Sequence, residues 1–86
     1  MANSTIKRIS GGVIAMINNV TTTATGNILT DITVPILCAW SYNNPDYIIF
    51  PWKSKATGKW YFHVLTTSGV VAANVSIDTI AYVYLE

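Results

Sequence analysis

Short runs that alternate in the manner of β-strands fill almost the whole chain, and turn-forming residues interrupt them at regular spacing. No segment keeps the 3.6-residue period of an amphipathic helix. The runs lie at 13–17, 21–25, 27–33, 36–42, 47–52, 59–66, 70–73 and 75–85. Short strands at intervals of about 8–12 residues are typical of an antiparallel sandwich or a small barrel. We therefore expect an all-β protein, namely a small antiparallel β-sandwich of jelly-roll or immunoglobulin-like type with about seven or eight strands.

The turns predicted between these runs have a local chemical basis. The clearest loop is Asn-Asn-Pro-Asp at 43–46, in which each residue type favours turns. A second loop, KSKATGK at 53–59, separates two alternating runs and is expected to close a hairpin. Pro35 marks a strand edge or a bulge, because proline lacks the amide hydrogen that a strand ladder uses.

The chain has 86 residues, which is the size of one small domain. Only 10% of the residues are charged and 51% are apolar, a composition that excludes intrinsic disorder. Residues 1–10 (MANSTIKRIS) are polar and mixed, so we expect a flexible N-terminal lead-in there. Residues 11–86 are expected to form a single β-sandwich domain.

Several predicted strands are apolar on both faces. Val13, Ala15 and Ile17 alternate with Ile14 and Met16, so both sets are apolar. A two-layer sandwich needs only one apolar face on each strand. Copies of the same chain in a symmetric oligomer are the simplest cover for the second face. The alternative is that these residues are ordinary surface, because apolar atoms form more than half of any protein surface.

Charge and hydropathy exclude two classes of partner. The net charge is +1, and the lysines at 53–59 are interpreted as a solvated loop rather than as a basic stripe for nucleic acid. No apolar run approaches the length of about 18 residues that a membrane helix needs. We expect no nucleic-acid binding, no membrane insertion and no signal peptide, and therefore synthesis in a cytoplasm without classical export.

The residues hold no recognisable reaction motif. One cysteine and one histidine exclude an intramolecular disulfide and a Cys/His metal set. Cys38 lies in an apolar run and is expected to be a buried small hydrophobe, and His63 is expected to be a half-exposed strand residue. Asp31, Asp46 and Asp78 show no spacing that demands a catalytic pair. We expect a protein that is not an enzyme, with no catalytic residue, no metal and no cofactor.

Aromatic residues with polar neighbours are the best candidates for ligand binding. One group surrounds the loop at 43–46 and comprises Trp40, Tyr42, Asn43, Asn44, Asp46 and Tyr47. The other surrounds the loop at 53–59 and comprises Trp52, Lys53, Trp60 and Tyr61, with Lys55 and Lys59 beside them. Sugar recognition uses a flat apolar platform with amides, carboxylates or lysines beside it, and the same mixture suits protein recognition. The alternative for each tryptophan is a core position, because an indole ring buries a large area.

The second half of the chain resembles a known group of viral proteins. The resemblance rests on the segments PILCAWS (35–41), YIIFPW (47–52), GKWYFHV (58–64), VAANV (71–75) and IAYVYL (80–85). In rhythm and composition they are similar to the small C-terminal β-sandwich tips of bacteriophage tail fibres, tailspikes and baseplate receptor-binding proteins. The likeness covers about residues 11–86 and includes no fixed catalytic or binding motif.

Membership of that group implies a homotrimeric tip in the virion, made in the cytoplasm of the host bacterium and attached to other tail proteins. The implied function is non-enzymatic binding of a bacterial surface saccharide or receptor through the two aromatic groups. Two alternatives remain open at the level of the sequence. One is a structural trimerisation or assembly cap without a ligand, and the other is a carbohydrate-binding accessory of a depolymerase tailspike.

Overall fold

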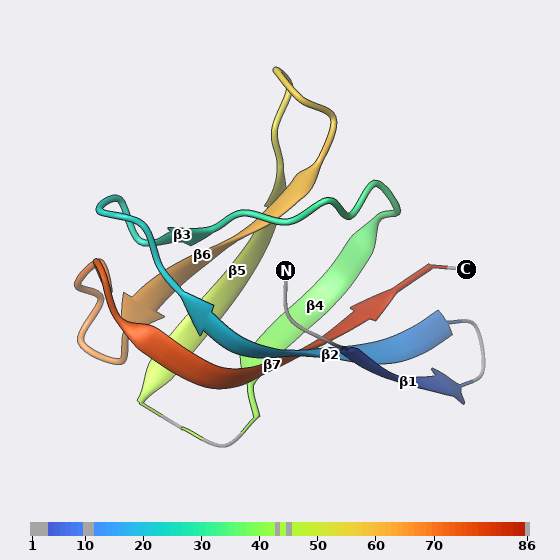
Figure 1. The fold of residues 1–86 in the computed structure, drawn as a ribbon, viewed down its shortest axis with the longest axis horizontal. Coiled ribbons are helices and arrows are strands. Elements are labelled where there is room, and N and C mark those ends of the chain that lie inside the picture. Colours follow the sequence, from blue (N-terminus) through green and yellow to red (C-terminus); the bar gives the residue numbers. More distant parts are fainter. Residues whose placement is uncertain (1–3, 10–11, 43, 45, 86) are drawn as a thin grey trace.

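The protein consists of two antiparallel β-sheets that pack face to face (Figure 1). The computed structural model describes residues 4–9, 12–42, 44 and 46–85. The first sheet has the strand order β1-β2-β7-β4, and the second has the order β3-β6-β5. The strands are β1 (Ser4–Ile9), β2 (Gly12–Thr21), β3 (Asn27–Ile28), β4 (Ile36–Ser41), β5 (Tyr47–Lys53), β6 (Trp60–Thr66) and β7 (Ser76–Tyr84). The described residues form no helix.

The core lies between the inner faces of the two sheets. Ile17 and Ile80 from the first sheet and Phe62 and Val64 from the second are each completely buried. Burial of one such side chain contributes about 1.5–3 kcal/mol. This core explains how a chain with no disulfide framework holds its two sheets together.

Strand β1 forms one edge of the first sheet, where it pairs antiparallel with β2 from Ser4↔Ile17 to Ile9↔Gly12. The sequence instead predicted a flexible lead-in over residues 1–10. The difference has a physical reason, because edge strands accept polar and charged residues such as Lys7 and Arg8 that a central strand does not. Residues 1–3 and 10, which belong to the same prediction, lie outside the described residues.

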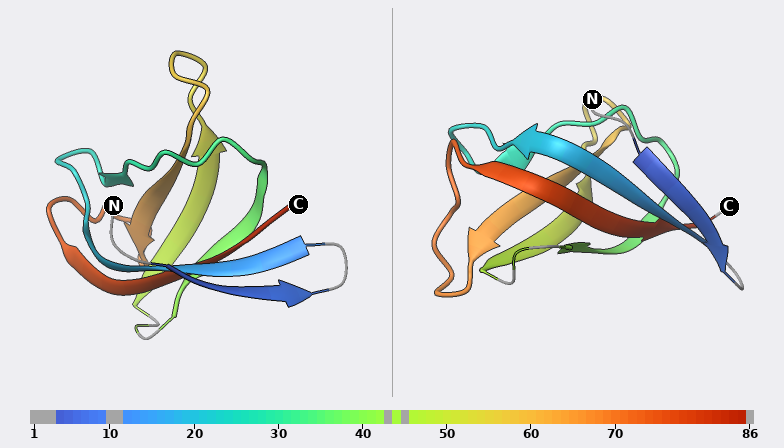
Figure 2. Two further views of the ribbon diagram at one scale, coloured as in Figure 1. Left: turned by 45° about the vertical axis from the view of Figure 1, so that its right-hand side comes forward. Right: turned by 60° about the horizontal axis from the view of Figure 1, so that its bottom comes forward.

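The chain passes between the sheets four times, from β2 to β3, from β3 to β4, from β4 to β5 and from β6 to β7. Strands β4 and β5 follow one another and lie side by side, one in each sheet (Figure 1 and Figure 2). The segment 29–35 crosses from β3 in the second sheet to β4 in the first (Figure 1). We call residues 29–35 the crossover segment.

The expected all-β class and the two antiparallel sheets are confirmed. Six strands have six residues or more, whereas β3 has only two. The strand expected at 27–33 is short because the Thr30 hydroxyl donates to the Trp60 carbonyl and accepts from the Ile32 amide. Side-chain bonds of this kind compete with strand pairing. The run expected at 70–73 forms only the isolated bridge Leu65↔Val71.

The sheet order also distinguishes this sandwich from the immunoglobulin-like topology. An immunoglobulin constant domain places its fifth strand beside its second and fourth, and its seventh strand in the opposite sheet. Here β7 lies between β2 and β4, and β5 lies in the opposite sheet. The C-terminal strand is therefore at the centre of the larger sheet.

Candidate binding surface

The two aromatic groups predicted from the sequence lie at opposite ends of β5. The first group surrounds the connection between β4 and β5, and the second surrounds the loop between β5 and β6 (Figure 1). A strand rises about 3.3 Å per residue, so the seven residues of β5 separate the two loops by roughly 20 Å. The groups therefore do not form one loop-based site.

Around the first loop, the candidate residues have different surroundings. Tyr42 is 55% exposed, and Asp46 is also exposed. Asn44 is half-buried, and its Oδ1 accepts a hydrogen bond of 2.9 Å from the Asp46 amide. Tyr47 packs against the core. Asn43 lies outside the described residues.

Around the second loop, the neighbouring aromatic residues point to opposite faces of the second sheet. Trp60 is half-buried and packs against the core, whereas Trp52 is 39% exposed. Tyr61 is half-buried, and its hydroxyl lies 3.0 Å from the hydroxyl of Thr57. Lys53 is exposed. Trp52 and Tyr61 therefore remain candidates for ligand contact, while Trp60 stabilises the domain.

The outer face of the second sheet carries a continuous set of large side chains that the loop-based prediction passed over. Directly paired residues of an antiparallel ladder point to the same face. The pairs on the outer face are Ile48↔Leu65, Phe50↔His63 and Trp52↔Tyr61. We call these six residues the outer aromatic face. Its β5 members are unusually open, because Ile48, Phe50 and Trp52 are 39%, 49% and 39% exposed.

The Trp52 end of that face is held by specific side-chain contacts. The rings of Trp52 and Tyr61 meet edge to face, with centroids 5.2 Å apart and an interplanar angle of 79°. Such a pair contributes about 0.5–1.5 kcal/mol beyond its buried area. The indole is also held by a hydrogen bond of 3.3 Å from Trp52 Nε1 to Asn27 Oδ1. Trp52 is thus a flat, oriented and accessible platform.

The same amide oxygen settles the hydrogen-bonding state of His63. An indole Nε1–H only donates, so the Asn27 atom beside it is the acceptor oxygen. His63 Nδ1 lies 3.0 Å from that oxygen and must therefore carry a proton. In a neutral imidazole the other nitrogen, Nε2, is then an acceptor. A neutral His63 consequently brings an acceptor nitrogen to the outer aromatic face, where His63 pairs with Phe50.

Trp40 belongs to a different surface, the outer face of the first sheet. It pairs with Ala81, which in turn pairs with Met16. Trp40 is 40% exposed, Met16 is half-buried and Ala81 is completely buried between them. A second row of the same face is Ile14, Val83 and Cys38. The side chains of these two rows are all apolar or weakly polar.

The position of Cys38 corrects one expectation. The thiol was predicted to be buried, but Cys38 is exposed. The ladder shifts register between Ile36 and Cys38, so the extra residue reverses the alternation of β4. Ile36 therefore points into the core and Cys38 points outward.

Within the described residues, the structure offers no group of three or more His, Cys, Asp or Glu that could hold a metal ion. Asp31 is paired with Lys59 at 3.1 Å, and both side chains are well exposed, so this pair is screened by water. No helix in the described part of the chain has the length and hydropathy needed to cross a bilayer. Comparisons with protein-family models, curated proteins and solved structures find no match. The surface chemistry is therefore the basis for a functional proposal.

Proposed function

We propose that this protein is a non-enzymatic tail-tip module of a bacteriophage that binds a bacterial surface saccharide or receptor through its outer aromatic face. The observation that carries the proposal is the exposed Trp52 ring, held by Asn27 and Tyr61 beside an acceptor nitrogen of His63. A sugar ring presents C–H groups on one face and hydroxyls around its edge. The indole supplies the apolar platform for the former, and His63 Nε2 supplies an acceptor for the latter.

Homotrimer formation is the second part of the proposal, and the outer face of the first sheet supports it. Ile14, Met16, Trp40 and Val83 form an apolar cluster there, bordered by the polar pair Asn18 and Thr79. Interface centres are depleted of charge and enriched in aromatic residues and methionine. Trimerisation through this face leaves the outer aromatic face of each protomer available, so that weak single-site binding is multiplied in the particle. Attachment to other tail proteins and location in the virion belong to the same proposal.

A matched pair of tryptophan variants tests the assignment of the two faces. Trp52 and Trp40 are almost equally exposed, at 39% and 40%, but belong to different sheets. Binding to an array of bacterial surface glycans and to intact bacteria is measured for Trp52→Ala and Trp40→Ala. We expect Trp52→Ala to lose about 2 kcal/mol of binding, or about 30-fold in affinity, because exposed aromatic anchors dominate such surfaces.

The oligomeric state is read from the native mass by light scattering at micromolar concentration. The expected mass of the trimer is about three times the chain mass of 9.4 kDa. Trp40→Ala is expected to lower this mass, and Trp52→Ala is expected to leave it unchanged. A wild-type trimer that binds no glycan and no bacterium contradicts the binding function and favours an assembly cap. A monomer that binds glycans contradicts the trimer alone.

A further inference from the structure

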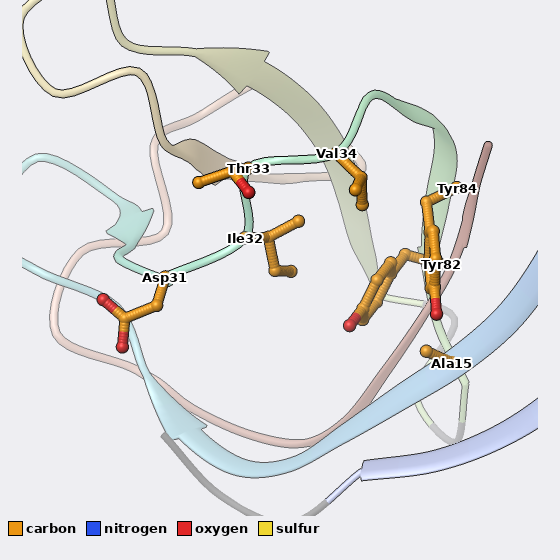
Figure 3. A pocket seen from close by; sticks show the side chains of 7 residues that line it. All are labelled: Ala15, Asp31, Ile32, Thr33, Val34, Tyr82 and Tyr84. Atoms are coloured by element: carbon orange, nitrogen blue, oxygen red, sulfur yellow. The ribbon is translucent and has the colours of Figure 1, made fainter. Parts of the chain in front are cut away.

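A pocket of about 310 Å³ lies between the crossover segment and the inner face of the first sheet (Figure 3). Side chains from three elements line it. Ala15 of β2 lies on one side with Tyr82 and Tyr84 of β7, and residues 31–34 of the crossover segment lie on the other. Ligand pockets in proteins begin at about this volume, so the pocket suits a compound of a single ring.

The small side chain of Ala15 creates the space. Ala15 and Tyr82 are direct partners in the ladder of β2 and β7, and both point to the inner face. The neighbouring inner positions of β2 are filled by Val13 and Ile17. A methyl group at position 15 therefore leaves a hollow beside the Tyr82 ring that a larger side chain would occupy.

The walls of the pocket are fixed in place. The backbone of the crossover segment accepts hydrogen bonds at two points, from the Trp60 amide to the Ile32 carbonyl at 2.8 Å and from the Leu85 amide to the Pro35 carbonyl at 3.1 Å. On the opposite wall, the Tyr82 ring lies between Phe62 and Tyr84, with centroids 5.5 and 5.9 Å away. The pocket is therefore preformed, which lowers the entropic cost of binding.

The hydroxyl groups of both tyrosines lack a hydrogen-bond partner among the described residues, and Figure 3 shows the Tyr82 hydroxyl pointing into the pocket. Tyr82 as a residue is only 5% exposed, but its hydroxyl is not among the buried polar atoms without a partner, so solvent still reaches this oxygen. A ligand hydroxyl can therefore replace water there and bond to the phenol. Burial, with a smaller contribution from Tyr84, raises the pKa of Tyr82, so the phenol stays neutral and can both donate and accept.

The remaining lining restricts the charge of a ligand. None of the seven lining residues is cationic, so the pocket provides no oppositely charged side chain for an anion. The carboxylate of Asp31 is already paired with Lys59 at 3.1 Å. The lining thus combines aromatic rings and the aliphatic side chains of Ile32 and Val34 with neutral hydroxyls.

We propose that this pocket binds one ring of a neutral saccharide, with its C–H face against the tyrosine rings and its hydroxyls bonded to Tyr82 and Tyr84. A neutral sugar ring satisfies the tyrosine hydroxyls and the apolar wall at the same time. The site is separate from the outer aromatic face, and it does not depend on that face being a binding surface.

The test is an NMR titration of the full chain with methyl glucoside, methyl galactoside and N-acetylglucosamine. Glucuronic acid, glucosamine and phenol serve as anionic, cationic and purely aromatic comparisons. We expect saturable shifts of the amides of Ala15, Ile32 and Val34 with at least one neutral sugar at millimolar concentration, and weaker effects of the three comparison compounds.

Two variants assign the site. Tyr82→Phe removes a hydroxyl that has no protein partner in the described residues, so the fold is expected to persist, while the affinity falls by about three- to tenfold. Trp52→Ala changes only the outer aromatic face and is expected to leave this binding unchanged. Absence of saturable shifts, unchanged affinity in Tyr82→Phe, or stronger binding of a charged sugar or phenol overturns the proposal. Shifts confined to Trp52 and its neighbours overturn it as well, while supporting the outer face as the sugar site.

Discussion

The inner and outer faces of the β5–β6 hairpin are built from similar side chains but have opposite solvent exposure. On the inner face, Phe62 and Val64 are completely buried and Ile49 is 5% exposed. On the outer face, Phe50 is 49% exposed. Folding of one chain accounts for the inner set, since burial of that set forms the core. The outer set gains little from folding, so its apolar character points to a partner or a ligand.

The two phenylalanines give the sharpest test of this comparison. Phe62→Ala leaves a cavity in the core and is expected to cost about 3–5 kcal/mol in the free energy of unfolding. Phe50→Ala is expected to cost less than about 1 kcal/mol, because half of the Phe50 side chain is already in water. Urea denaturation monitored by circular dichroism measures both values. Equal costs would mean that the outer face is part of the folding core, and the comparison would fail.

Threonines extend the comparison from apolar to polar groups. Thr22 is buried, and its hydroxyl donates to the Ala72 carbonyl at 2.6 Å and accepts from the Val75 amide at 2.9 Å. Thr22→Val leaves both backbone groups without this partner and is expected to cost about 1–3 kcal/mol. Thr25→Val, at an exposed position, is expected to change stability by less than about 0.5 kcal/mol. Thermal unfolding compares them, and a Thr25→Val loss as large as that of Thr22→Val would contradict the buried role.

The alternation of side chains along the sequence predicted most of this fold, because the strands are short and each buries one face. The runs at 36–42, 47–52, 59–66 and 75–85 correspond closely to β4, β5, β6 and β7. Two backbone irregularities limited what alternation could predict about burial. The register shift in β4 exposes Cys38, and Asn19, with a positive φ of 55°, accompanies a change of buried face in β2. In β2 the buried positions run 13, 15 and 17 but then move to Val20.

The candidate site was less predictable for a different reason. Composition around loops identified Trp52 and Tyr61, but proximity in sequence also selected Trp60, which faces the core. The outer aromatic face depends on the pairing of β5 with β6, which adds Phe50 and His63. Strict alternation in the two strands was the available signal for these residues. The two hydrogen bonds to Asn27 come from Trp52, 25 positions away, and His63, 36 positions away. No local sequence pattern could have predicted them.

The buried phenol of Tyr82 provides a test of stability in alkaline solution. The pKa of Tyr82 is raised above its ordinary value of 10.0, chiefly by burial and secondly by Tyr84. The unfolded chain therefore loses this proton at a lower pH than the folded chain. The stabilising contribution is complete below pH 10 and is lost as the pH rises through the folded pKa, with a slope of at most about 1.4 kcal/mol per pH unit for one proton.

Urea unfolding between pH 8 and pH 11 measures this loss, and Tyr82→Phe is the control. The variant is expected to have a flatter alkaline limb because it lacks the titrating hydroxyl. If wild type and Tyr82→Phe lose stability in parallel, the alkaline loss comes from other groups, and the described environment of Tyr82 is contradicted.

Asn27 gives a small expected change in stability and the most direct information about the outer aromatic face. Asn27→Ala removes the oxygen that accepts from both Trp52 Nε1 and His63 Nδ1. These bonds are partly exposed, so we expect a cost below about 1 kcal/mol. Nitrogen-15 NMR of the imidazole should show the Nδ1-protonated tautomer in the wild type and a shift toward the Nε2-protonated form in Asn27→Ala. Thr25→Val, which removes the hydroxyl beside the Asn27 amide nitrogen, is expected to keep the wild-type tautomer. An Nε2-protonated wild type would place a donor where we infer an acceptor, and the proposed contact with a sugar hydroxyl would then need the opposite polarity.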